Sequence, residues 1–318
     1  MSLPELVERA RGRNKHAIAQ LVGLFEDTRA GSPARRAEAL SLLTASAPAG
    51  RRHGVIGLTG TPGAGKSSLV ARVVPRLLEL DASLTVAVLA VDPASHVSGG
   101  ALLGDRTRTR FGNDDRAYFR SQSNATELGG LAPTTYQVSR LLQQLFDVVI
   151  VETVGIGQSE LDVRYLADHV YLVLQPLGGD EIQFLKAGII EIPDSFVLNK
   201  CDDPAASMSY YQLRSALALA RPFDQELPAI HRTSARTGEG IDALCDAMLA
   251  VVRAPGRRSD EDRQAYFFNR WVSDEWGNVG RRFAGTAPGG AAGVLQSAGG
   301  FDAAQVWFGR HIIGWLGA

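Results

Sequence analysis

The stretch Gly60-Thr61-Pro62-Gly63-Ala64-Gly65-Lys66-Ser67 decides the fold of this chain. It matches G-x-x-x-x-G-K-[ST] and lies between an apolar run, Val55 to Thr59, and a stretch, Ser68 to Leu80, with apolar residues at helical spacing. A strand, a glycine loop and a helix N-terminus form a phosphate cradle, because glycines let backbone N–H groups turn toward an anion and the helix dipole adds positive potential. We therefore predict a nucleoside triphosphate site, with Lys66 at the terminal phosphates and the Ser67 hydroxyl on Mg²⁺.

A second motif, Asn199-Lys200-Cys201-Asp202, follows the short apolar run Phe196 to Leu198. In an N-K-x-D motif the Asp carboxylate accepts hydrogen bonds from the guanine ring N–H and from the exocyclic amine. Adenine has no such donor pair and would leave a buried acceptor unpaired, so the carboxylate selects the base by chemistry. Thr233-Ser234-Ala235, which follows an apolar stretch, resembles the loop that offers a backbone N–H to the guanine oxygen. The order of the three motifs predicts GTP rather than ATP.

The predicted nucleotide contacts come from the glycine loop and from the two guanine segments. They are Gly60, Thr61, Pro62, Gly63, Ala64, Gly65, Lys66, Ser67, Ser68, Asn199, Lys200, Asp202, Ser234, Ala235 and Arg236. The expected ligands are GTP and GDP with Mg²⁺.

Three carboxylates lie where a metal ion beside the phosphates would need them. Asp92 ends the apolar run Val88 to Val91, Asp105 lies in a polar loop, and Glu152 ends the run Val148 to Val151 shortly before Gly155. We expect these three side chains and Ser67 to form one oxygen-rich shell around Mg²⁺. The alternative is that they are solvated loop carboxylates. The predicted catalytic residues in this region are Lys66, Asp105 and Glu152.

The chain divides into three parts. Residues 1–50 are expected to be helical, since Ser2-Leu3-Pro4-Glu5 reads as a capping box and the residues from Ile18 to Phe25 form an apolar stripe. Between residues 51 and 253, strand-like and helical stretches alternate. Such alternation predicts an α/β fold with a doubly wound, mostly parallel sheet and the nucleotide at the carboxyl ends of its strands.

The third part, residues 254–318, contains all four tryptophans of the chain. Apolar residues at helical spacing predict two helices, separated by a glycine-rich joint from Gly285 to Gly300. About 60 residues with a flexible middle do not readily bury so many aromatic side chains alone. This segment therefore either packs on the rest of the chain or forms a subunit interface, and we expect a dimerisation arm.

Composition excludes several classes of protein. The net charge of −1 over 318 residues gives no attraction to nucleic acid or to anionic membranes. No apolar run approaches the length of a membrane span, and the N-terminus lacks the apolar stretch of a signal peptide. Two cysteines, Cys201 and Cys245, make no disulfide framework. We expect a cytoplasmic protein.

Together these motifs resemble the MeaB/ArgK/MMAA GTPases. The resemblance rests on the glycine loop, on Val91-Asp92-Pro93, on Gly99-Gly100-Ala101-Leu102-Leu103-Gly104-Asp105-Arg106 and on Val151-Glu152-Thr153-Val154-Gly155-Ile156-Gly157-Gln158-Ser159-Glu160, and it covers about residues 1 to 255. It implies a homodimeric GTPase that chaperones a cobalamin-dependent acyl-CoA mutase of the methylmalonyl-CoA type. Such proteins gate cofactor loading and protect the mutase, which in turn accelerates GTP hydrolysis.

The resemblance also implies a role for the loop from Gly178 to Lys186, which is similar to the mobile switch III of that family. No arginine finger within the chain can be assigned, although GTP hydrolysis needs positive charge at the transition state. We therefore expect slow hydrolysis by the chain alone, with the mutase ordering this loop and Lys186 contributing to the stimulated reaction. The alternative is that Lys186 is a solvated helix residue.

Two other functions remain open from the sequence. A nickel-insertion metallochaperone GTPase would need clusters of metal ligands, whereas the six histidines here are scattered along the chain. A phosphotransferase acting on protein or arginine would need a kinase-type catalytic loop, and no H-R-D motif is present. GTP binding without turnover is a third possibility, which a phosphate-release assay would separate from a GTPase.

Overall fold

In the computed structural model, the apolar run before the glycine loop forms strand β1 (Gly54–Gly60), with every residue buried. The structure describes residues 1–45, 53–92, 114–123, 131–153, 160–176, 192–221, 226–254 and 258–317. They form two compact units. One, here called the nucleotide unit, comprises Arg52–Thr135 and Phe146–Arg257, and the other, the helical unit, comprises Met1–Arg51, Tyr136–Leu145 and Arg258–Ala318.

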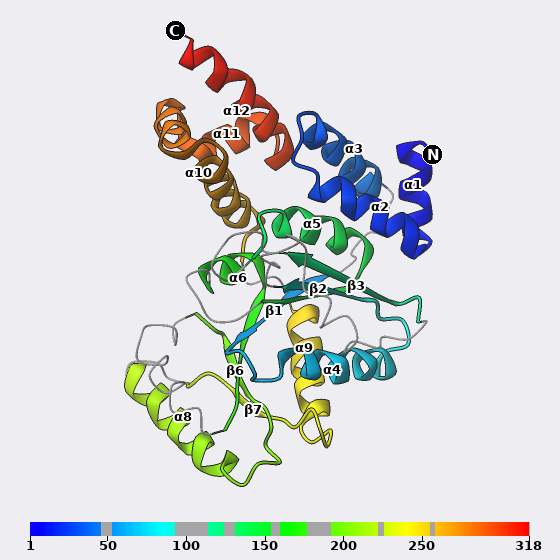
Figure 1. The fold of residues 1–318 in the computed structure, drawn as a ribbon, viewed down its shortest axis with the longest axis vertical. Helices are drawn as coiled ribbons and strands as arrows, with labels where there is room; N and C mark the ends of the chain where they lie inside the picture. The colour runs from blue at the N-terminus through cyan, green and yellow to red at the C-terminus, as the bar shows by residue number, and fades with distance from the viewer. Residues whose placement is uncertain are drawn as a thin grey trace, which may run out of the picture. The chain divides into compact units, whose positions relative to one another are not determined.

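The nucleotide unit is built on one parallel sheet with strand order β3-β2-β4-β1-β5-β6-β7 (Figure 1). Besides β1, its strands are β2 (Val86–Asp92), β3 (Ala117–Ser123), β4 (Val148–Glu152), β5 (His169–Leu174), β6 (Ser195–Leu198) and β7 (Ile230–Arg232). The sheet confirms the predicted α/β class. Because all strands are parallel, their carboxyl ends and the loops that follow lie at one edge of the sheet.

Helices cover both faces of this sheet, because residues on opposite faces of β1 pack against different helices. Ile56 and Leu58 point into a core shared with α4 (Lys66–Leu80) and α9 (Ile241–Arg253). Gly57, between them in sequence, faces α6 (Glu160–Leu166), since side chains alternate along a strand. On β5, Leu172 and Leu174 pack with α8 (Ala206–Ala220) in a second core cluster. The sheet is therefore doubly wound.

The helical unit brings both ends of the chain together. It contains α1 (Leu3–Arg11), α2 (Lys15–Glu26) and α3 (Ser32–Ala45), most of α5 (Thr135–Leu145), and α10 (Asp260–Thr286), α11 (Gly290–Ala298) and α12 (Phe301–Leu316). The capping box at Ser2 and Glu5 is present, and the stripe from Ile18 to Phe25 is buried. Phe267, Phe268, Phe301 and Phe308 are buried among the C-terminal helices, where their rings contact one another or neighbouring aromatic rings.

One prediction for the C-terminal part is wrong. Most of the glycine-rich joint between Gly285 and Gly300 is helix α11, which buries Ala291, Val294 and Leu295. Packing of these three side chains outweighs the low helix propensity of the surrounding glycines. Gly289 and Gly299 cap the helix with left-handed backbone angles, so glycine serves at its ends.

Two elements near the site were not predicted, strand β3 and helix α6. The sequence of β3, AYFRSQS, mixes polar and apolar residues because β3 is an edge strand that is buried only in part. Helix α6 is only 7 residues long, too short for a clear periodic pattern. Within the described part of the chain, no helix is both long and apolar enough to cross a membrane.

Candidate nucleotide site

The glycine loop joins the end of β1 to the start of α4, as a phosphate cradle requires. Gly63 and Gly65 have φ angles of 82° and 89°, in the left-handed region that glycine adopts without strain. At Gly65 space is limiting as well, because a Cβ would lie 2.6 Å from Nδ2 of Asn199. A Cβ at Gly60 would lie 2.1 Å from the carbonyl oxygen of Val173 on β5. The loop is therefore packed directly against the ends of neighbouring strands.

Lys66 is buried inside this loop, with its side chain folded back over it. Its ammonium donates to the carbonyl oxygens of Gly60, at 2.7 Å, and Thr61, at 3.2 Å. These bonds hold a positive charge beneath the backbone N–H groups at the N-terminus of α4, where an anion is stabilised. The next residue, Ser67, donates its hydroxyl to Oε1 of Glu152 at 2.6 Å, which links α4 to the end of β4.

Two buried carboxylates lie at the carboxyl ends of adjacent strands. Glu152 ends β4 and pairs in register with Ala90 of β2, and Asp92 ends β2 two residues further on. Asp92 accepts a hydrogen bond from the hydroxyl of Ser121 on β3. Hydroxyl and carboxylate oxygens are the donors that Mg²⁺ prefers, so Ser67, Glu152 and Asp92 fit that ion. The fourth predicted ligand, Asp105, lies outside the described residues.

The loop after β4 begins with a further link to the phosphate cradle. The hydroxyl of Thr153 donates to that of Thr59 at 3.0 Å, and the Thr153 amide donates to the carbonyl oxygen of Leu58. Both contacts fix the residue after Glu152 against the end of β1. Nothing in the sequence motifs pointed to this pair of buried hydroxyls.

Asn199 connects the phosphate cradle to the guanine segments. Its Nδ2 donates to the carbonyl oxygen of Ala64 at 2.9 Å, and its Oδ1 accepts from the Ala235 amide at 3.1 Å and from the Thr233 hydroxyl at 3.3 Å. The side chain is 1% exposed, so these bonds are shielded from water. Three segments far apart in the sequence thus meet at one amide.

Asp202 lies beside the Ser-Ala segment. Its carboxylate accepts from the hydroxyl of Ser234 and forms an ion pair with Arg236. The hydrogen bond from Ser234, supported by the charge of Arg236, lowers the pKa of Asp202 below its usual value. The carboxylate is therefore ionised at neutral pH, as an acceptor for guanine N–H groups must be.

These segments enclose a pocket of about 630 Å³. That volume lies in the range of pockets for small ligands and cofactors. The lining residues come from the helix start, from the N-K-x-D segment and from the loop after β7: Gly65, Ser68, Asn199, Lys200, Asp202, Asp203, Pro204, Ala235 and Arg236. All but Asp203 and Pro204 were predicted, and those two directly follow the motif in sequence.

The structure also identifies neighbours that motif reading missed. Ser121, which donates to Asp92, lies on the unpredicted strand β3. Gln175, directly after β5, accepts a hydrogen bond from Lys200 at 2.6 Å. Neither residue belongs to a recognisable motif, because a single hydroxyl or amide can be placed by any segment that reaches the site. Lys186 lies outside the described residues, as does the loop from Gly178.

Comparison with known proteins agrees with this geometry. Residues 18–276 match the family model described as methylmalonyl-CoA mutase-associated GTPase MeaB. A Caulobacter vibrioides protein named as a GTPase is 39% identical over 274 residues, covering 82% of each chain. A mouse protein named methylmalonic aciduria type A homolog, mitochondrial, is 41% identical over 199 residues, which are 61% of this chain and 48% of the mouse protein.

A solved structure supports the fold independently. The crystal structure of a LAO/AO transport system kinase superposes with a TM-score of 0.58 at 24% identity, covering 88% of this chain and 95% of the other. At this identity the likeness bears on the fold alone. The family match spans most of the chain, including the phosphate cradle and the guanine segments. This chain therefore belongs to the MeaB family of methylmalonyl-CoA mutase-associated P-loop GTPases.

Proposed function

We propose that this chain binds GTP with Mg²⁺ at the site described above and hydrolyses it to GDP and phosphate. The observation that carries the proposal is Asn199, which joins the glycine loop to the Ala235 amide and so holds the phosphate cradle next to the pocket lined by Asp202 and Ala235. The ionised carboxylate of Asp202 in the same pocket favours guanine over adenine.

Each side chain has a role in this proposal. Lys66 and the backbone N–H groups of the glycine loop hold the phosphates. Ser67, Glu152 and Asp92 hold Mg²⁺, which neutralises charge on the phosphate oxygens when bound. Asp105 completes the metal shell, and Lys186 contributes charge to the stimulated reaction. The last two assignments rest on the sequence, since both residues lie outside the described part of the chain.

We propose that the partner is a cobalamin-dependent acyl-CoA mutase of the methylmalonyl-CoA type, whose cofactor loading this chain gates and which it protects. The description of the matched family and the name of the mouse relative support this partner. In this proposal hydrolysis by the chain alone is slow and the mutase accelerates it. For the nickel-insertion alternative, the described residues contain no group of three or more His, Cys, Asp or Glu that would hold a metal ion.

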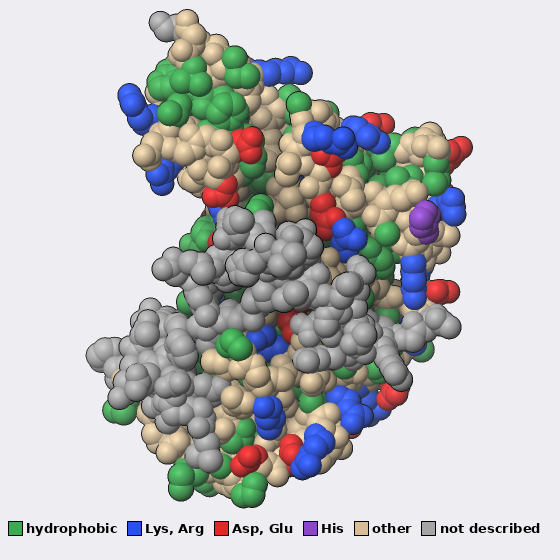
Figure 2. All heavy atoms as spheres, viewed as in Figure 1, with side chains coloured by type: hydrophobic (Ala, Val, Ile, Leu, Met, Phe, Trp, Pro, Cys, Tyr) green, Lys and Arg blue, Asp and Glu red, His purple; other side chains and the backbone are tan. Residues whose placement is uncertain are grey.

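We further propose that the chain forms a homodimer through its C-terminal helices. Val279, Ile313, Trp315 and Leu316 of α10 and α12 are exposed apolar residues. Figure 2 shows hydrophobic side chains gathered over these helices. Exposed aromatic and aliphatic side chains of this kind are enriched at interfaces. Light scattering tests this: wild type should have twice the monomer mass, and Ile313→Glu should reduce it.

Phosphate release with and without the mutase tests the main proposal. We expect slow release by the chain alone, faster release with mutase, and almost none from Lys66→Ala in either case, because Lys66 contacts phosphate in the ground and transition states. Release by Lys66→Ala at the wild-type rate would contradict the assigned phosphate site. Release that mutase does not alter would contradict the proposed partner while leaving the GTPase intact.

Base selection is tested by exchanging Asp202 for asparagine. Asp202→Asn should lose GTP affinity and gain affinity for xanthosine triphosphate, whose carbonyl oxygen replaces the exocyclic amine and pairs with the new amide donor. Calorimetric titration with both nucleotides measures the change. Equal GTP affinity in wild type and variant would remove the basis for the guanine assignment.

A further inference from the structure

One arginine connects the phosphate-binding helix to the loop that holds the base. Arg72, on α4 six residues after Lys66, donates from Nε to the carbonyl oxygen of Ala235 at 2.8 Å and from Nη2 to that of Arg236 at 3.0 Å. Both carbonyls belong to the loop after β7, which lines the base end of the pocket. We propose that Arg72 is a positioning residue that sets guanine selectivity by fixing this loop.

The first bond orients a peptide group of the pocket wall. In a trans peptide the C=O and the following N–H point in opposite directions, and the described residues contain no cis bond. Holding the Ala235 carbonyl on Arg72 therefore turns the Arg236 N–H away from Arg72. The Ala235 N–H, one peptide earlier, is occupied by Oδ1 of Asn199. In this proposal the Arg236 N–H is the loop donor that Arg72 orients for the guanine oxygen.

The second bond reaches Asp202, which faces the amine end of the guanine in this proposal, through a short relay. Arg72 fixes the Arg236 carbonyl, and the N–H of the same peptide, that of Thr237, donates to Oγ of Ser234 at 3.1 Å. The Ser234 hydroxyl in turn donates to Oδ1 of Asp202. Because every link is a directional hydrogen bond, displacing this peptide also displaces the carboxylate that reads the guanine amine.

A planar guanidinium suits this task better than an ammonium. Arginine presents its N–H donors in a rigid fork, so two acceptors on adjacent residues are held in a fixed relation. Lysine carries the same charge at a single point and cannot fix both carbonyls with that geometry. Replacing Arg72 with lysine therefore separates positioning from the general effect of a positive charge near the phosphates.

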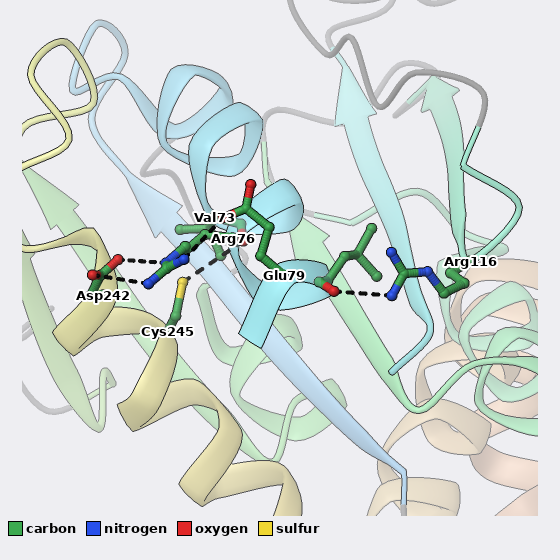
Figure 3. Close-up of polar contacts among 7 residues, drawn as sticks. Val73, Arg76, Glu79, Arg116, Asp242 and Cys245 are labelled. Carbon is green, nitrogen blue, oxygen red and sulfur yellow. Dashed lines mark hydrogen bonds and ion pairs between the residues drawn. The ribbon is translucent and has the colours of Figure 1, made fainter. Parts of the chain in front are cut away.

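The chain also supplies a matched control on the same helix. Arg76, one turn further along α4, binds Asp242 at the start of α9, from Nε at 2.7 Å and from Nη2 at 3.2 Å, and it also contacts Glu79 (Figure 3). Like Arg72, it links α4 to the segment that follows β7. Both of its described partners are carboxylates outside the base loop. Comparing the two arginines separates loop positioning from the packing of α4 on α9.

This inference rests on the proposed GTP function, and calorimetric titration of the full chain with GDP and with inosine diphosphate tests both. Inosine lacks the exocyclic amine, so the ratio of the two affinities reports the contact with Asp202. We expect Arg72→Ala to weaken GDP binding about ten-fold, the effect of losing roughly one net hydrogen bond. We also expect it to lower the ratio of GDP affinity to inosine diphosphate affinity. Arg72→Lys should lower this ratio too. Arg76→Ala should leave both the GDP affinity and the ratio within about two-fold of wild type.

The possible outcomes are distinguishable. Equal effects of Arg72→Ala and Arg76→Ala, or full restoration by Arg72→Lys, would overturn the positioning role while wild-type selectivity stands. A wild-type chain that binds neither nucleotide would overturn the proposed function and this inference together. Thermal unfolding of each variant shows that it is folded, and since both arginines lie at the surface of α4 we expect melting temperatures close to wild type.

Discussion

At the scale of single residues, the site depends on atoms that approach too closely for any side chain to be added. Gly65 faces the amide of Asn199, so the turn that cradles phosphate and the amide that organises the base site share one small space. The same glycine has a φ of 89° and precedes the first helical residue, Lys66. A substitution here therefore affects the backbone and the neighbouring motif at once.

Gly65→Ala tests whether this position needs both a left-handed backbone and the absence of a side chain, and Gly63→Ala is the control. Both positions have left-handed φ angles, which cost an alanine about 1 kcal/mol or more, but a Cβ at Gly63 meets nothing within 4 Å. We expect Gly65→Ala to destabilise the chain more than Gly63→Ala does and to abolish nucleotide binding, because Asn199 must move off Ala64. Denaturant unfolding and GDP titration measure both effects. Equal destabilisation by the two variants would show that the contact with Asn199 is unimportant.

Cys245 illustrates a residue whose ionisation is governed mainly by burial. Its side chain is fully buried between α9 and α4, with Sγ 3.8 Å from the carbonyl oxygen of Val73 (Figure 3). Burial, aided by the negative charge of Asp242, raises the pKa of the Cys245 thiol from 9.0 to about 12. The folded chain therefore retains this proton at pH values where the unfolded chain has lost it.

The sign of the resulting pH dependence follows. Below pH 9.0 both states carry the proton and stability is unaffected, whereas between pH 9.0 and about 12 only the unfolded state ionises and stability falls. We expect wild type to lose about 1.4 kcal/mol more per pH unit in this window than Cys245→Ala does. Urea unfolding from pH 8 to 10.5 measures the difference. If the free energy of unfolding changed with pH in the same way for the two proteins, the Cys245 thiol would ionise in the folded chain as readily as in the unfolded chain.

At the scale of elements, the distance between α6 and the sheet is set by a glycine in β1. A Cβ on Gly57 would lie 2.8 Å from Cγ2 of Val163 on α6 and 3.2 Å from Cβ of Ala167, the residue directly after α6. The helix thus rests almost on the strand backbone.

A double-mutant cycle measures this contact. Gly57→Ala should destabilise the chain by about 1–3 kcal/mol, the usual cost of overpacking, and Val163→Ala by an amount typical of a small cavity. The double variant should be more stable than the sum of the two effects predicts, because removing Cγ2 makes room for the new methyl group. Additive changes in the free energy of unfolding would mean that α6 shifts at little cost to make room for the new methyl group. Gly57 would then not set the position of the helix.

At the scale of the whole molecule, a buried charge cluster holds the helical unit together. Arg36 on α3 donates to Asp302 at 2.9 Å and to Gln305 at 2.7 Å, both on α12, and Arg140 on α5 donates to the other oxygen of Asp302 at 2.6 Å. The side chains of Arg36 and Asp302 are 4% and 2% exposed. Three segments from the start, middle and end of the chain thus share one carboxylate.

Asp302→Ala should therefore be strongly destabilising, by about 3–5 kcal/mol, because it leaves the buried charge of Arg36 without its counter-ion. Asp274→Ala serves as the control. Asp274 pairs with Arg270 within α10 and is 47% exposed, and such a surface pair contributes less than about 1 kcal/mol. Chemical unfolding followed by far-UV circular dichroism compares them. Similar losses for the two variants would mean that Arg36 finds other compensation in the fold.

The sequence by itself determined the nucleotide unit in outline. The run before Gly60, the glycine loop and the periodic helix after it predicted β1 and α4, and the continuous apolar runs predicted β2, β4, β5 and β6. These features are local, because a strand buried on both faces must be apolar throughout and a phosphate loop needs glycines at fixed spacing. The predicted nucleotide contacts could be named for the same reason.

Only the tertiary structure decided how distant segments combine. Arg72, Ser121 and Gln175 reach the site from parts of the chain without a motif, and each contributes through a single polar contact or a pair of them. Helix α11 forms in a glycine-rich stretch because its apolar side chains are buried. The N-terminal and C-terminal helices, which look like independent segments in the sequence, form one unit around Asp302. Periodicity records which face of an element is buried, but it does not record the partner against which that face packs.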